Sequence, residues 1–198
     1  MAVVLIEGDN GTGKTTISQK FSENGFYVVT DESAIKELEK QAKNFTVGSK
    51  ERIDAFIAYN IYCGNEALKY RNSLIVRYWI STISAAYADG LFSLKEAIQK
   101  TKILSQVLPQ PDFIFRLKCD YDVRVKRIAT RNLKTYDTSD NITFERDKKY
   151  QEILSKIEKY LKNWHNINTV DKNPEQIFTF MMSVIKSPKT KASYEKNV

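Results

Sequence analysis

The sequence has few of the residues that mark secreted or metal-binding proteins. Its 198 residues include 2 cysteines and 1 histidine, and Cys63 and Cys119 lie far apart without a CxxC or Cys/His spacing. This excludes a disulfide framework and a cysteine-rich zinc site. With 7 glycines and 4 prolines, the chain is neither collagen-like nor a low-complexity polymer. Isolated thiols suit a reducing compartment, so we expect a cytoplasmic protein.

Long apolar runs are missing as well. The longest, such as Ala2 to Ile6, fall far below the ~20 residues that a helix needs to cross a bilayer, so we expect no membrane segment. A secretory signal needs an apolar run of roughly 7–15 residues after a basic start. The first run here meets Glu7 after only a few residues. The composition, 42% hydrophobic and 28% charged, predicts one globular domain over residues 1–186.

The charge excess is spread without a basic stripe. Lysine and arginine number 31 against 24 acidic residues, a formal net charge of +7, which favours phosphate-bearing partners. Much of the excess lies in residues 187–198, which we expect to form a flexible basic tail. Elsewhere cations alternate with acids, as on solvated helix faces. We therefore expect a small-molecule partner and no nucleic acid.

Short β-branched runs alternate with longer helical patterns along the chain. The expected strands are Ala2 to Glu7, Tyr27 to Thr30, Leu74 to Val76, Phe113 to Leu117 and Ile167 to Val170. The clearest expected helices cover Lys50 to Tyr70 and Lys148 to Trp164. This alternation predicts an α/β fold in which a parallel sheet of about five strands has helices on both faces.

A phosphate-binding pattern follows the first expected strand directly. Its sequence, GDNGTGKT, is a complete GxxxxGK[ST] match. Glycines let backbone amides approach an anion, and the N-terminus of the following helix adds partial positive charge. Lys14 is expected to bridge the β- and γ-phosphates of ATP or another triphosphate, and the Thr15 hydroxyl to bind Mg²⁺. The expected nucleotide-binding residues are Gly8, Asp9, Asn10, Gly11, Thr12, Gly13, Lys14, Thr15 and Thr16.

Several segments resemble the thymidylate kinase family, in the order in which the family has them. Glu7 to Thr16 resembles the EGxDGxGKTT opening, Val76 to Ser81 the DRYxxS segment, and Pro111 to Leu117 the PDxxxxL strand. Tyr121 to Arg131 resembles the helix that leads into a mobile lid, and Phe144 to Tyr150 the FERxxxxY helix beyond it.

This resemblance, which spans Val3 to about Ile185, implies both a fold and an activity. The implied fold is the three-layer P-loop kinase fold with a lid at about residues 131–144. The implied activity is ATP- and Mg²⁺-dependent phosphoryl transfer to a nucleoside monophosphate. Thymidylate kinases are commonly dimers, so a homodimer is a further implication, with residues 56–62 as a candidate apolar helix face.

Arginines supply the remaining candidate catalytic groups. Arg124, Arg127 and Arg131 are spaced by three and four residues, which predicts one cationic helix face. The resemblance implies that Arg127 and Arg131, and less so Arg124, stabilise charge on the transferred group. Arg77, in the segment that resembles DRYxxS, is expected to hold the acceptor or its phosphate.

Three positions depart from the family pattern. Val76 stands where the family has an aspartate that orders magnesium. The segment Asp31 to Ser33 stands where an REP motif supplies an arginine for the acceptor phosphate. Asn10 stands where an acidic residue holds the acceptor ribose, and Asp9 lies one position earlier.

These departures leave alternatives for the acceptor. A monophosphate close to Asp31 and Glu32 would meet repulsion of roughly 1–4 kcal/mol per close charge pair. A sugar hydroxyl would gain from a carboxylate base, and Glu32 falls where deoxynucleoside kinases carry one. The two acids also suit the first turn of a helix. A P-loop switch NTPase and a nucleotide-binding module without catalysis are further alternatives; the leading hypothesis is a nucleoside monophosphate kinase.

Overall fold

The computed structural model describes residues 2–135 and 143–187, except for the side chains of 31 and 132–135. The described chain forms a five-stranded sheet in the order β2-β3-β1-β4-β5, and each pairing is parallel. Its strands are β1 (Ala2–Glu7), β2 (Tyr27–Val28), β3 (Asn72–Val76), β4 (Phe113–Lys118) and β5 (Trp164–Asn168). The predicted α/β class and strand number are confirmed.

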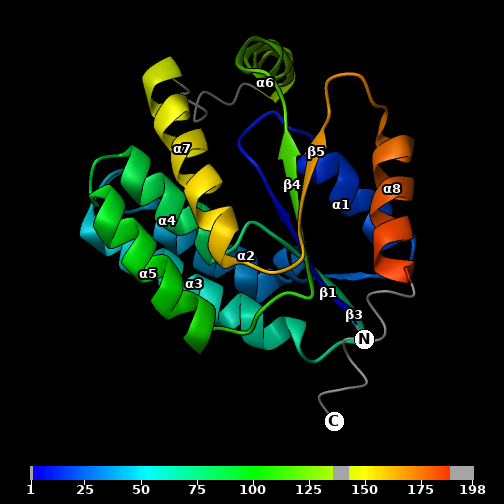
Figure 1. Cartoon of the computed structure of the whole chain (residues 1–198), viewed down its shortest axis with the longest axis horizontal. Coiled ribbons are helices and arrows are strands. Elements are labelled where there is room, and N and C mark those ends of the chain that lie inside the picture. The colour runs from blue at the N-terminus through cyan, green and yellow to red at the C-terminus, as the bar shows by residue number, and fades with distance from the viewer. Residues whose placement is uncertain (1, 136–142, 188–198) are drawn as a thin grey trace.

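Helices cover both faces of the sheet (Figure 1). They are α1 (Lys14–Glu23), α2 (Ser33–Lys43), α3 (Lys50–Ala67), α4 (Trp79–Ala88), α5 (Leu94–Val107), α6 (Tyr121–Thr135), α7 (Phe144–Ile157) and α8 (Pro174–Lys186). In Figure 1, α1 and α8 lie on one side of the sheet, and α3, α4, α5 and α7 lie on the other. Helix α6 lies beyond the carboxyl ends of β4 and β5, at the top of that view.

The central strand explains the three layers. Successive side chains of a strand point to opposite faces, so a strand covered on both faces is apolar throughout. Val3 and Leu5 of β1 pack in the core under α3, α4 and α7, whereas Val4 and Ile6 pack in the core under α1 and α8. All six residues of β1 are buried. The sheet is therefore the middle layer between two separate apolar cores.

Four of the five strand predictions were wrong at an end. Strands β3 and β4 are longer than predicted, since β3 begins at Asn72 and β4 ends at Lys118. Strand β2 ends at Val28 because the chain turns into a short 3-10 helix over Val29–Asp31. Strand β5 covers Trp164–Asn168 and not the predicted Ile167 to Val170, so the helix predicted to reach Trp164 is too long. Helix α7 ends at Ile157, and a left-handed residue, Asn163 (φ 53°), precedes the strand. Asparagine tolerates this conformation better than most residues, so the helical pattern ends before the strand begins.

The carboxyl ends of the strands lie at one edge, where the loops to the following helices gather. The expected lid of residues 131–144 is only partly described: α6 continues to Thr135, α7 begins at Phe144, and residues 136–142 lie outside the described chain. The expected tail lies outside it from residue 188 onward. Among the helices that are described, none has the length and apolar character that crossing a membrane requires.

Candidate active site

The loop between β1 and α1 has a backbone that only glycine permits at two contact points. Gly8 (φ 136°) and Gly11 (φ 79°) both lie at positive φ. A Cβ atom on Gly8 would lie 2.5 Å from the Leu117 carbonyl oxygen, and one on Gly11 would lie 2.9 Å from the Arg124 carbonyl oxygen. Both distances are too short for a side chain, so the loop is held against the end of β4 and the start of α6.

Helix α1 begins at this loop without a side-chain cap. Its N-cap is Gly13, whereas α5, α7 and α8 are capped by Ser93, Thr143 and Asn173. The first amides of α1 therefore point their hydrogen atoms toward the loop with no side-chain acceptor from the cap residue. Such an N-terminus suits an anion, which accepts these hydrogen bonds and interacts favourably with the helix dipole.

Lys14 lies inside the loop. Its side chain is buried, and Nζ donates a hydrogen bond of 2.7 Å to the Asp9 carbonyl oxygen. The Thr12 hydroxyl donates to the same oxygen at 2.8 Å. Burial lowers the pKa of Lys14 well below its ordinary value, and the nearby Arg77 charge lowers it further. An anion in the loop would offset this positive charge, so Lys14 fits a triphosphate tail.

The metal-binding prediction depends on a single threonine. Thr15 and Thr16 are exposed at the start of α1. Across residues 2–135 and 143–187, no group of three or more histidine, cysteine or acidic side chains could hold a metal ion. Val76 is half-buried at the end of β3 and packs against the apolar core under α1 and α8. The residues present therefore fit Mg²⁺ only as an ion shared between the Thr15 hydroxyl, phosphate oxygens and water.

A cavity of about 190 Å³ adjoins the phosphate loop. It is lined by Thr12, Gly13, Thr16, Ile17, Arg127, Thr169, Lys172, Pro174 and Ile177. Arg127 spans its wall: Nη2 donates to the Thr169 carbonyl oxygen at 3.0 Å, and Nη1 approaches the Gly11 carbonyl oxygen at 3.4 Å. Sequence reasoning missed Thr169 and Lys172 because they lie more than 150 residues from the loop and match no motif.

Arg77 follows β3 and faces the phosphate loop. Its backbone is left-handed (φ 65°), its amide donates to the Ile6 carbonyl oxygen at 3.0 Å, and its guanidinium donates to the Asn10 side-chain oxygen. A positive φ is unusual for a large side chain and is a feature of many functional sites. Among the described ion pairs, carboxylates bind Arg116, Arg124 and Arg146 but not Arg77. The hydrogen-bond partner of the Arg77 guanidinium is therefore a neutral amide, while its charge also acts on the buried carboxylates of Glu7 and Asp9 and lowers the pKa of each.

Glu7 is a buried acid that the sequence analysis did not select. It has no exposed surface, and its carboxylate accepts hydrogen bonds from the Tyr78 amide at 3.0 Å and from the Ser81 hydroxyl. The Tyr150 hydroxyl donates to Ser81 Oγ at 3.2 Å. Burial raises the pKa of Glu7 despite these bonds. The carboxylate fastens the end of β1 to the start of α4 and so fixes Arg77 between them.

The three arginines of α6 differ in exposure, although Arg124 and Arg127 both contact the phosphate loop. Arg127 and Arg131 are exposed, but the Arg124 side chain is 1% exposed and lies on the inner side of α6. Its guanidinium is 3.1 Å from the Asp9 carboxylate and 2.6 Å from the Asp147 carboxylate. The Asp9 side chain is thus turned toward α6. Spacing alone could not show which side of the helix packs against the phosphate loop.

Glu32 is the N-cap of α2. Its carboxylate accepts a hydrogen bond from the Ile35 amide at 2.9 Å. Bonds from the backbone amides of Ile35 and Ala34 lower the pKa of Glu32, which makes it a weaker base. Glu32 therefore fits the alternative in which it stabilises the first turn of a helix. Its role as a catalytic base stays a prediction that this geometry does not favour.

Comparison with known proteins identifies the family of this chain. The family model described as thymidylate kinase matches residues 6–180. The chain belongs to the thymidylate kinase family. Members of this family are nucleotide kinases that generally use ATP and Mg²⁺, so the chain is a nucleotide kinase, and the P-loop kinase fold that was predicted is confirmed.

Solved structures show how widely the fold is shared. Thymidylate kinase from Candida albicans matches with a TM-score of 0.71 and 19% identity, over 96% of this chain and 92% of that one. Deoxyadenosine kinase from M. mycoides with bound dATP matches with a TM-score of 0.65 and 14% identity, over 93% of this chain and 100% of that one. At these identities the likeness concerns the fold alone. A comparison with curated protein sequences finds no match.

Proposed function

We propose that this thymidylate kinase family member transfers the γ-phosphoryl group of Mg-ATP to a nucleoside monophosphate. The donor would place its phosphates in the Gly8 to Gly13 loop and its base in the adjoining cavity. The cavity shares Thr12, Gly13 and Thr16 with the loop, so one nucleotide can reach both. On binding, Lys14 Nζ would exchange the Asp9 carbonyl oxygen for phosphate oxygens.

The metal would rest on few protein groups. Mg²⁺, when bound, neutralises charge on the phosphates between which the transferred group passes. Thr15 is the residue placed to hold it through its hydroxyl. Val76 offers no metal ligand where the family has a carboxylate. Cationic side chains must therefore stabilise more of the charge that develops on the transferred group. Lys14, Arg127 and Arg131 are the cations we assign to this role.

The choice of a monophosphate as acceptor depends on the position of Arg77. It ends β3 beside the phosphate loop, and its described partner is the neutral amide of Asn10. A monophosphate dianion would accept hydrogen bonds from the Arg77 guanidinium, and these would be of the stronger, charge-assisted kind. A phosphate acceptor is already ionised and needs no catalytic base. This agrees with the Glu32 carboxylate being bound to the first turn of α2.

A panel of acceptors tests this proposal. Mg-ATP is mixed with the protein and with deoxynucleoside monophosphates or deoxynucleosides in turn, and ADP release is followed. We expect release that depends on a monophosphate. Release with nucleosides alone would move the assignment to the hydroxyl-acceptor alternative, and release without any acceptor would favour an NTPase switch. Binding of Mg-ATP without turnover would indicate a module that has lost catalysis.

We also propose that two copies associate through α3. The predicted face over residues 56–62 is only partly exposed, since Tyr59 is buried and Phe56 packs against the core. Ile61 and Leu68, the C-cap, are instead 43% and 48% exposed, and their spacing of seven residues places them on one side of α3. Light scattering should give the mass of a dimer for the parent and of a monomer for Ile61→Glu. A monomeric parent would contradict this part of the proposal.

A further inference from the structure

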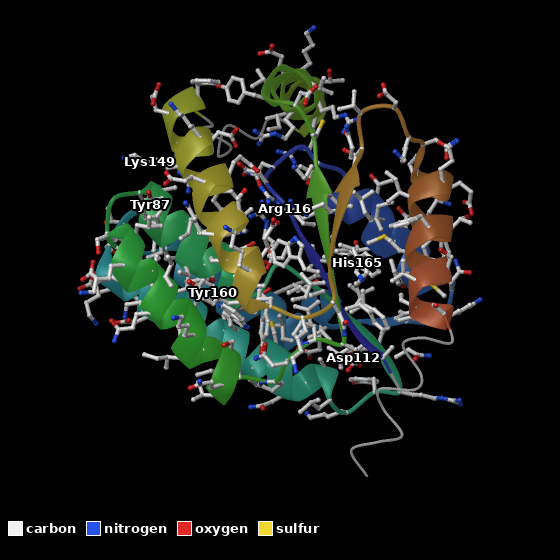
Figure 2. The ribbon with its side chains drawn as sticks, viewed as in Figure 1. Tyr87, Asp112, Arg116, Lys149, Tyr160 and His165 are labelled. Carbon is white, nitrogen blue, oxygen red and sulfur yellow. The ribbon has the colours of Figure 1, made fainter. Side chains whose placement is uncertain are left out.

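A chain of buried polar side chains runs from the phosphate loop into α7. Arg124 is its centre, with Nη1 3.1 Å from Asp9 Oδ2 and Nη2 2.6 Å from Asp147 Oδ2. From Asp147 the chain continues to Gln151, whose amide donates to Asp147 at 3.2 Å. Gln151 accepts a 2.6 Å bond from Arg116, which projects from β4 toward α7 (Figure 2). Four elements of the fold are thus joined through ion pairs and hydrogen bonds.

The loop end of this chain leads to the phosphate-binding lysine. The Asp9 carboxylate forms an ion pair with Arg124. The Asp9 carbonyl oxygen accepts hydrogen bonds from both Lys14 and Thr12. The backbone of Arg124 also packs against Gly11, where an added Cβ would be 2.9 Å from the Arg124 carbonyl oxygen. One residue of α6 therefore contacts the loop twice, once with its side chain and once with its main chain.

Stability alone does not account for such an arrangement. Arg124, Asp9 and Asp147 are 1%, 4% and 7% exposed. Removing charges from water is so unfavourable that a buried ion triad is often no more stable than apolar residues of the same volume. What the contacts do provide is a fixed place for the planar guanidinium, because Nε donates to the Cys119 carbonyl oxygen at 3.1 Å and Nη2 lies 2.6 Å from Asp147 Oδ2. Nη1 then meets Asp9 Oδ2 in the phosphate loop as an ion pair without a hydrogen bond.

We infer that Arg124 is a positioning residue for phosphoryl transfer: by binding Asp9 and Asp147 together, it fixes the carbonyl group that holds Lys14 and ties the phosphate loop to α7. This inference rests on the proposed kinase function. The Arg124 side chain is 1% exposed, so it is not placed to bind the nucleotide itself. Its effect reaches the reaction through Asp9, whose carbonyl oxygen accepts from Lys14 at 2.7 Å and whose carboxylate accepts from the Asn10 amide at 2.7 Å, so it concerns the placement of the donor first.

The test compares Asp147→Asn and Arg124→Lys with the matched variant Asp89→Asn. Asp89 also pairs with an arginine of α7, Arg146, at 2.7 Å, but lies outside the chain of contacts to the loop. Asp147→Asn should lower kcat about 10-fold and Arg124→Lys about 100-fold, with a smaller change in the acceptor KM, since small displacements of reacting groups have effects of this size. Asp89→Asn should lower Tm while kcat stays within about 2-fold.

Calorimetry keeps this result separate from the choice of acceptor. Titration with Mg-ATP needs no acceptor, and both network variants should bind it at least about 10-fold more weakly than the parent. If the parent binds Mg-ATP but phosphorylates no acceptor, the proposed function fails while this comparison still tests Arg124. If Asp147→Asn and Arg124→Lys fold and match Asp89→Asn in Tm, kcat and affinity for Mg-ATP, the network is structural only and the inference is overturned.

Discussion

The Arg77 guanidinium donates a hydrogen bond to the side-chain oxygen of Asn10, which joins the end of β3 to the phosphate loop. These are the two residues expected to lie between donor and acceptor. In the family pattern the Asn10 position is acidic, but here it is neutral. The positive charge of Arg77 is therefore not matched by the residue that holds it.

Arg77→Gln should impair acceptor binding more than donor binding. Glutamine can still bond to Asn10, but it lacks the charge that a phosphate needs. Hydrogen bonds to charged groups contribute about 1.5–3 kcal/mol, so we expect the KM for a monophosphate to rise about 10- to 100-fold. Steady-state kinetics at saturating Mg-ATP measure this. An equal rise in the KM for ATP would place Arg77 on the donor side instead.

Lys14→Ala should abolish turnover and leave the fold intact. Loss of one charged donor to the transferred group lowers kcat by at least about 10²–10³-fold. The fold should tolerate the change because burial lowers the pKa of Lys14, which means that its charge is unfavourable in the folded state. ADP release and thermal unfolding are measured on one preparation. Retained kcat would remove the assignment of this loop as the donor site.

Two variants of Glu32 distinguish a role in capping α2 from a role as a catalytic base. Glu32→Ala removes the bond to the Ile35 amide and should lower Tm, whereas Glu32→Asn keeps a good cap and should not. Neither should change kcat with a monophosphate. If Glu32 were the base for a hydroxyl acceptor, Glu32→Asn would slow nucleoside phosphorylation by about 10²–10⁴-fold, and that result would revive the alternative.

Glu7 should make stability depend on pH. Because burial raises its folded-state pKa above the ordinary 4.5, the folded protein holds this proton more tightly than the unfolded chain does. The free energy of unfolding therefore falls as the pH rises from about the ordinary value through the folded-state pKa. Glu7→Gln removes this dependence, so the stability of the variant relative to the parent should increase over that pH range. Urea unfolding at several pH values checks it; a difference that stays constant contradicts the burial effect.

The sequence predicted those parts of the site that are local. The phosphate loop could be recognised because its glycines and Lys14 act through backbone geometry within a few residues. Arg124 could not be distinguished from Arg127, because Arg124 is buried only when α7 brings Asp147 against it. Glu7 did carry a signal, an acid at the end of an apolar strand. The cavity needed tertiary structure, since Thr169 reaches it only when β5 lies beside β4.

Transfer of label from ATP tests the central claim most directly. The protein is mixed with Mg-ATP labelled at the γ-phosphate and with a deoxynucleoside monophosphate, and the labelled products are separated. This account predicts that the label appears in the nucleoside diphosphate, and that Lys14→Ala does not produce it. Label found only in inorganic phosphate, or remaining in ATP with every monophosphate, would contradict the account.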